Sequence, residues 1–286
     1  MDMSSGFFRF IIGLGKKVIL ANHLSIIVEQ FFGTEGTAIS VAGTWYAVIV
    51  YAMHIYFDFS GYSDMAIGMG EMFGFHFDEN FRHPFLCKDI SEFWQRWHIS
   101  LGTFFRDYLL YVPIFGKRRK YGGLFLVWFC TGLWHGASWN FIFWGLWHGF
   151  FIIVERITSW HKKEFNAAGN AVRHLCTILI FIIGWVMFRA ETMTYAAKYI
   201  LRMFGLGGAT EELYYWHYFI SNTEILIMAA ALICSMPIFR NLIYVKEGKF
   251  FLERKILLNL WLLILFVLSA ASIADATFNP FIYFRF

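Results

Sequence analysis

The amino-acid sequence predicts an all-α, multi-pass integral membrane protein, and composition is the first reason. The chain of 286 residues is 58% hydrophobic and only 15% charged, whereas a soluble domain is about half apolar and about a quarter charged. The second reason is that long apolar runs recur throughout the chain. Because a membrane helix needs about 20 apolar residues, these runs predict about six to eight membrane segments. We expect them to form one membrane domain, residues 1–286.

The membrane segments are expected where the apolar runs lie. The runs cover residues 38–57, 124–154, 172–188, 225–236 and 256–274. Residues 6–33 instead predict a short amphipathic helix with Lys16 and Lys17 on its polar side. An aromatic stretch at 212–220 and the tail "FNPFIYFRF" complete the chain, and such a tail suits the membrane interface.

Charge and cysteine usage narrow the classes of function. The net charge is only +4, and the run "KRRK" at 117–120 predicts a cytoplasmic loop under the positive-inside tendency. Contact with anionic lipid headgroups would account for the same patch. Nothing in the composition predicts a nucleic-acid partner. The four cysteines lie far apart without a CxxC pair, which argues against a metal site or a disulfide framework.

Acidic side chains occur inside an apolar segment at residues 56–75. The segment contains the carboxylates Asp58, Asp64 and Glu71. At membrane depth a charged residue costs about 2.5–3.5 kcal/mol on insertion scales, so it usually faces a cavity or a partner. Two interpretations stay open, a polar cavity or ion pairs with arginines such as Arg82 or Arg96.

The best-specified helix is predicted to begin near Asp89. Asp89 and Glu92 have the D-x-x-E spacing of a capping box, with Asp in place of the usual Ser or Thr. Apolar residues then recur at intervals of three and four as far as Tyr108, which places them on one helix face. His98 falls at the border of that face, about 70° from its centre. The helix carries too many charges to span a membrane, and we expect it in the interface or folded into the protein.

The letters GLWHG occur twice in the stretch "GLWHGASWNFIFWGLWHG", residues 132–149. Its glycines form two small-xxx-small pairs, Gly132 with Gly136 and Gly145 with Gly149, which let neighbouring helix backbones approach closely. His135 and His148 therefore each lie beside a predicted helix contact. Ionisable groups inside a membrane segment are candidates for a functional site.

Three classes of function compete for these histidines. A haem protein would hold iron between histidines on facing helices, but His135 and His148 are 13 positions apart, about 20 Å along one helix. A transporter or channel would use Asp58 and Asp64 with broken helices. An acyltransferase would use a neutral imidazole as base, and histidine suits this because its unperturbed pKa is about 6.5. No G-x-S-x-G motif is present, which favours direct transfer over a covalent enzyme intermediate.

Three long motifs resemble the membrane-bound O-acyltransferase (MBOAT) family. They are "FDFSGYSDMAIGMGEMFGFHFDENFRHPF", "ISEFWQRWHISLGTFFRDYLLYVP" and "GLWHGASWNFIFWGLWHG", in this order. Within the family the resemblance is strongest to bacterial alginate O-acetyltransferases, and the ending "NPFIYFRF" is similar to theirs. The resemblance implies a ring of membrane helices around a central cavity or tunnel, with interfacial amphipathic helices beside it.

The resemblance also implies the roles of individual residues. The family's catalytic histidine lies in its LWHG motif, which matches His135, and its second histidine lies in its RWHIS motif, which matches His98. His148 falls in the later copy and is expected to be a structural echo. The residues expected to line or support the substrate tunnel are Trp134, Asn140, Arg96 and Asp58.

The implied reaction transfers an acyl group, expected to be acetyl, toward hydroxyls of an exported cell-surface polysaccharide, with His135 as general base. The donor, such as acetyl-CoA or an acyl carrier, is a cosubstrate, and no bound cofactor or metal is expected. The expected partners are membrane lipid, the polysaccharide acceptor and periplasmic or extracellular acyltransferase proteins, at a bacterial inner membrane.

Length is where the sequence departs from the family. Its members typically have several further membrane helices before the "GLGKKV" region, so we expect this chain to be the C-terminal part of the fold with upstream helices missing. The alternative function is a noncatalytic membrane subunit or transporter, which passes acyl groups or substrate to a partner.

Overall fold

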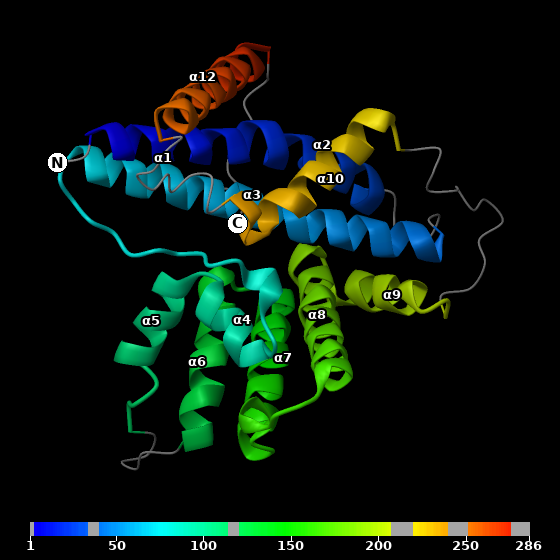
Figure 1. Cartoon of the computed structure of the whole chain (residues 1–286). Coiled ribbons are helices and arrows are strands. Elements are labelled where there is room, and N and C mark those ends of the chain that lie inside the picture. Colours follow the sequence, from blue (N-terminus) through cyan, green and yellow to red (C-terminus); the bar gives the residue numbers. More distant parts are fainter. Residues whose placement is uncertain (1–2, 34–39, 114–119, 207–219, 240–250, 276–286) are drawn as a thin grey trace. The chain divides into compact units, whose positions relative to one another are not determined.

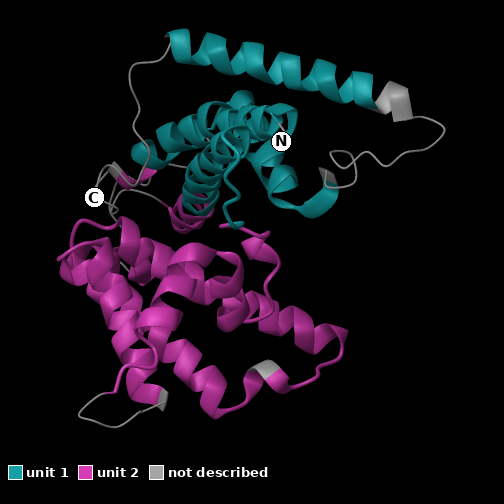
Figure 2. Ribbon diagram, turned by 90° about the vertical axis from the view of Figure 1, so that its left-hand side faces the viewer, with its two compact units in different colours: residues 1–30, 50–79, 217–285 teal, residues 31–49, 80–216, 286 magenta. Residues whose placement is uncertain are grey.

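The computed structural model describes residues 3–33, 40–113, 120–206, 220–239 and 251–275. All regular elements among these residues are helices (Figure 1), so the all-α class is confirmed for them. The chain forms two compact units (Figure 2). Unit 1 comprises Met1–Gln30, Val50–Glu79 and His217–Arg285, and unit 2 comprises Phe31–Ile49, Asn80–Trp216 and Phe286. The single membrane domain stays a prediction.

Unit 1 is built mainly from helices at the two ends of the chain. Its elements are α1 (Met3–Gly15), a π-helical stretch (Lys16–Ala21), most of α2 (Asn22–Gly33), most of α3 (Val41–Met72), α10 (Asn222–Ser235) and α12 (Phe251–Asp275). The backbones of α1 and α3 approach closely at glycines, because a Cβ on Gly13 would lie 2.6 Å from the carbonyl oxygen of Gly61. Substitution at either position would therefore push the two helices apart.

The short amphipathic helix predicted over residues 6–33 is wrong. Residues Met3–Phe32 form an apolar helical segment of 30 residues, which is long enough to cross a membrane. The prediction placed Lys17 on a polar helix side, whereas only 6% of Lys17 is exposed and its ammonium forms an ion pair with Asp58 of α3. A paired lysine can be buried where an unpaired lysine could not.

Unit 2 contains the sequence motifs with the histidines. Its elements are α4 (Ile90–Arg96), α5 (Ile99–Tyr108), α6 (Lys120–His135), α7 (Trp139–Ile157), α8 (Ala167–Arg189) and α9 (Met193–Met203), with single 3₁₀ turns at Pro84–Leu86 and Trp160–Lys162. The apolar run 124–154 forms the hairpin of α6 and α7. A Cβ on Gly145 would collide with the Trp128 carbonyl oxygen and approach Gly132 to about 3.0 Å. The predicted close contact at these two glycines is confirmed.

Three helical segments among the described residues are long and apolar enough to cross a membrane, Met3–Phe32, Ala167–Arg189 and Lys255–Ala274. The last two confirm the segments predicted at 172–188 and 256–274. The run 38–57 belongs to the longer α3, and the run 225–236 forms most of α10. The total of six to eight segments stays a prediction. The KRRK loop before Lys120, the stretch 212–219 and the C-terminal tail lie outside the described residues.

Candidate active site

His135 is the last residue of α6. The helix ends there because of a glycine, Gly136, and a serine, Ser138. Gly136 has a φ of +153°, a conformation that L-residues with a side chain rarely adopt. Ser138 then caps the next helix, since its hydroxyl accepts a hydrogen bond from the Asn140 N–H at 3.4 Å. The sequence LWHGAS thus places an imidazole at the end of a helix rather than along its side.

Aromatic rings surround the His135 imidazole, which is only 8% exposed. The ring centroids of Trp134 and Trp144 lie 4.9 Å from it, and that of Phe188 lies 5.1 Å away. All three meet the imidazole nearly edge to face, at interplanar angles of 81–88°. We call Trp134, Trp144 and Phe188 the aromatic cage. It brings together α6, α7 and α8, and it limits the orientations that His135 can adopt.

His98 separates α4 from α5, so the single helix predicted from Asp89 to Tyr108 is wrong. Its backbone is left-handed, with φ of 47° and ψ of 53°, which costs roughly 1–2 kcal/mol for a residue with a Cβ. The apolar spacing continues through the break, and that continuity made one helix the simplest interpretation. The N-terminus was predicted correctly, since the Asp89 carboxylate accepts from the Glu92 N–H at 2.7 Å. Glu92 itself accepts from the N–H of Lys88, not of Asp89.

Asn80 holds the strained turn at His98. Its backbone oxygen accepts from the Ile99 N–H at 3.1 Å, and its Oδ1 accepts from the Ser100 N–H and hydroxyl at 3.1 and 2.9 Å. Oδ1 also lies 3.3 Å from Nδ1 of His98. The tautomer with its proton on Nδ1 donates to Asn80 and leaves Nε2 as an acceptor.

The two predicted histidines meet at one tryptophan. The Trp134 ring lies 4.9 Å from His135 and 5.9 Å from His98, and 52% of Trp134 is exposed. Helices α4 and α5 are too short to span a membrane, and burial lowers the pKa of His98 to about 3. The His98 imidazole is therefore neutral at pH 7. The site combines two buried imidazoles with one partly open aromatic wall.

The other predicted site residues have partners that hold the fold together. The Asn140 amide donates to the backbone oxygen of Ala190, which ties α7 to the end of α8. Arg96 binds Glu92 at 2.6 Å and also donates to the Arg82 carbonyl oxygen. Asp58 belongs to unit 1, where Lys17 is its ion-pair partner. Of the four residues expected to line a tunnel, Trp134 is the one that the structure brings to both histidines.

Glu155 of α7 was missed by the sequence analysis. It connects α4, which ends next to His98, to α7. Its carboxylate accepts from the N–H groups of Ile90 and Ser91 at 2.8 and 3.0 Å, and from the Ser91 hydroxyl at 2.7 Å. It thereby fixes the start of α4, the helix that ends next to His98, against α7, the helix that carries Trp144. No motif of the sequence signalled this bond, because the partners are more than 60 residues apart.

His148, in the second GLWHG copy, is placed differently from His135. It is 1% exposed, and the rings of Trp94, Trp144 and Trp128 lie 5.0, 5.4 and 6.0 Å from it. A Cβ on Gly184 would lie 2.5 Å from its Nε2, so α8 approaches the imidazole very closely. Neither ring nitrogen has a hydrogen-bond partner within the described part of the chain. The packing supports the interpretation of His148 as a structural residue.

Within the residues that the structure describes, no three His, Cys, Asp or Glu side chains come together in a group that could hold a metal ion.

Comparison with known proteins places these residues in a family. The model of the membrane-bound O-acyltransferase family matches residues 3–198, which include both motif histidines. A probable alginate O-acetylase of Pseudomonas putida is 35% identical over 99% of this chain and 61% of its own length. A probable alginate O-acetylase of Pseudomonas aeruginosa is 42% identical over 71% of this chain and 39% of its own length.

A relative with a different named acceptor is the peptidoglycan O-acetyltransferase of Helicobacter pylori, which is 38% identical over 73% of this chain and 40% of its own length. The chain thus spans between about two fifths and three fifths of the length of these relatives. The family model covers well over half of the chain, and it includes the helix that ends at His135 and the turn that holds His98. The chain belongs to the membrane-bound O-acyltransferase family.

Proposed function

We propose that this chain is the catalytic part of a bacterial inner-membrane O-acyltransferase that transfers acetyl groups toward hydroxyls of an exported cell-surface polysaccharide. The observation that carries the proposal is the position of His135, at a helix end inside the aromatic cage, with Trp134 shared with His98. The names of the relatives, two alginate O-acetylases and a peptidoglycan O-acetyltransferase, support the choice of acetyl and of a surface polymer.

In the proposed mechanism, the neutral imidazole of His135 accepts the proton of the acceptor hydroxyl while that oxygen attacks the acyl carbonyl of a thioester donor. The tetrahedral intermediate then collapses, the C–S bond breaks, and the imidazolium returns its proton to the leaving thiolate. The acyl group ends on the acceptor oxygen, and His135 is regenerated as the neutral base. Acetyl-CoA or an acyl carrier would serve as donor.

The neighbouring residues have separate tasks in this proposal. The aromatic cage holds the imidazole in one orientation and excludes water, which would otherwise hydrolyse the donor. His98 stays neutral and orients the donor or the acceptor by hydrogen bonding, and the exposed side of Trp134 forms part of the substrate route. In this proposal, periplasmic or extracellular partner proteins deliver the acetyl group to the polymer.

The two GLWHG copies provide a matched experiment. Ester-linked acetyl on the surface polysaccharide is measured in cells that carry wild type, His135→Leu or His148→Leu, at equal membrane levels. We expect His135→Leu to lower acetylation by about 10²–10⁴-fold, the usual contribution of a general base. We expect His148→Leu to retain most of it, because that change removes an imidazole without hydrogen-bond partners.

Full acetylation by a folded His135→Leu protein would contradict the catalytic role. It would favour a membrane subunit that passes acyl groups or substrate to a partner enzyme. Equal loss in both variants would indicate that the cluster of rings, rather than the His135 base, is what the reaction requires.

A further inference from the structure

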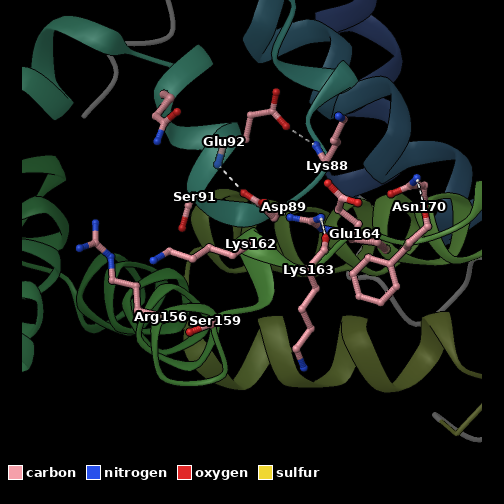
Figure 3. A pocket seen from close by; sticks show the side chains of 13 residues that line it. Lys88, Asp89, Ser91, Glu92, Arg156, Ser159, Lys162, Lys163, Glu164 and Asn170 are labelled. Carbon is pink, nitrogen blue, oxygen red and sulfur yellow. Dashed lines mark hydrogen bonds and ion pairs between the residues drawn. The ribbon is translucent and has the colours of Figure 1, made fainter.

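A large polar pocket lies in unit 2 at the start of α4, next to the connection between α7 and α8 (Figure 3). Its volume is about 970 Å³, which is at the upper end of the range for small-molecule and cofactor sites. Five of its lining residues are basic: Lys88, Arg156, Lys162, Lys163 and Arg173. Three are acidic, Asp89, Glu92 and Glu164. The proposed acyl transfer makes no use of this pocket.

The acidic residues of the pocket are mostly neutralised by partners of their own. Asp89 forms a buried ion pair with Arg173, and Glu92 is bound by Arg96 at 2.6 Å. Arg173 is therefore already paired. Among the lining residues, Glu164 is the remaining acid and four other residues are basic. The pocket therefore keeps an excess of positive charge.

Three of these cations are available to a ligand. Arg156, Lys162 and Lys163 form no ion pair with any described residue, and all three are exposed. Lys163 lies over the ring of Trp160 at 5.6 Å, so its charge is held beside the pocket. Like charges gathered in one concave surface repel one another, and an anion that enters relieves this repulsion.

We propose that this pocket binds the phosphate groups of an anionic ligand. Lysine ammonium groups and an arginine guanidinium are the side chains that bind phosphate oxygens, the first as point charges and the second through paired N–H groups. A pocket of this size accepts a ligand with several phosphates or a phospholipid headgroup, whereas a single inorganic ion would leave most of it empty. Helix α4 connects the pocket to the candidate active site, since Gln95 lines the pocket three residues before His98.

The test measures binding alone, so its result does not depend on acyl transfer. The purified full chain in neutral detergent is titrated with coenzyme A, which carries phosphates, and with pantetheine, which does not. In parallel, micelles are supplemented with phosphatidylglycerol or with phosphatidylcholine. The pocket variant is Lys162→Gln/Lys163→Gln. The matched control, Arg106→Gln/Lys198→Gln, removes two exposed positive charges from unit 2 outside the pocket.

We expect wild type and control to bind an anionic probe at least tenfold more tightly than the pocket variant, with affinity falling as salt is added. Binding of coenzyme A but not pantetheine would identify a nucleotide-type phosphate source. Preference for phosphatidylglycerol over phosphatidylcholine would identify a lipid headgroup. Equal binding of both anionic probes by wild type and pocket variant, or an equal loss in the control, would overturn the proposal.

Discussion

The carboxylates of α3 in unit 1 and two histidines of unit 2 are buried among apolar helices, but their surroundings differ. In unit 1 the carboxylates of α3 meet cations from the start of the chain. Asp58 pairs with Lys17, and Asp64 lies 3.1 Å from Arg9 and 2.6 Å from Lys16. In unit 2, His135 and His148 pack against tryptophan and phenylalanine rings instead.

The difference follows from what each group can do when it is buried. Lysine and aspartate are charged near neutral pH, and removing such a charge from water costs several kcal/mol unless an opposite charge is in contact. An imidazole has a neutral form near pH 7, and that form can be packed against rings at little cost. The ion pairs of unit 1 therefore hold helices together, whereas a neutral imidazole in unit 2 needs no opposite charge beside it.

Removing one partner of the buried pair in unit 1 should have the largest effect on stability. Lys17→Met leaves the Asp58 carboxylate buried without its cation, so we expect the free energy of unfolding to fall by about 3–5 kcal/mol. The measurement is reversible unfolding in mixed detergent micelles. The double variant Lys17→Met/Asp58→Leu should recover most of the loss, because it leaves no unpaired charge. A single variant as stable as wild type would remove the distinction between the two units.

Helix contacts in unit 2 should be sensitive to a single methyl group at one glycine and not at another. A Cβ on Gly145 would collide with the backbone of α6 at Trp128, whereas the atom nearest to a Cβ on Gly102 would be 3.7 Å away. We expect Gly145→Ala to destabilise by about 1–3 kcal/mol. Gly102→Ala, on the exposed side of α5, should stabilise by about 0.5–1 kcal/mol, because alanine favours the helix. The free energy of unfolding, measured in the same micelles, should fall for Gly145→Ala and rise for Gly102→Ala. Equal changes in the two variants would show that α6 and α7 can move apart at Gly145 without loss of stability.

Much of the fold and part of the site could be predicted because they depend on neighbouring residues. The helix contact at Gly132 and Gly145, the cap at Asp89 and the apolar helices α8 and α12 each follow from a local pattern. The choice of His98, His135 and Trp134 as site residues followed from motif resemblance, not from spacing.

The features that were missed depend on partners far away in the chain. Asp58 was expected to line a tunnel or to pair with arginines such as Arg82 or Arg96, whereas its ion-pair partner is Lys17, 41 positions earlier. Asn80 lies in the first motif but was given no role, and Glu155 lies in none of the three motifs, yet they hold the two ends of α4 through bonds to His98, Ile90 and Ser91. The break at His98 was hidden because a histidine, rather than a glycine, adopts the left-handed conformation.

Glu92 provides the smallest and most specific test, because it is a carboxylate in unit 2 that is paired in the manner of unit 1 but only partly buried. Burial alone would raise its pKa, but the Lys88 N–H at 2.7 Å and the Arg96 guanidinium outweigh burial, and the pKa of Glu92 is lowered. A lowered pKa in the folded state adds stability above the unfolded value of about 4.3, and this stability is lost as pH falls through the folded pKa.

We therefore expect Glu92→Gln to be less stable than wild type at pH 7 and the difference to shrink below about pH 4, where the wild-type carboxylate also becomes neutral. The measurement is unfolding in micelles at a series of pH values. Asp107→Asn, at the exposed pair with Arg106, is the control and should show no comparable change. A Glu92→Gln difference that stayed constant from pH 7 to pH 3 would mean that shape, rather than charge, decides how the start of α4 is held.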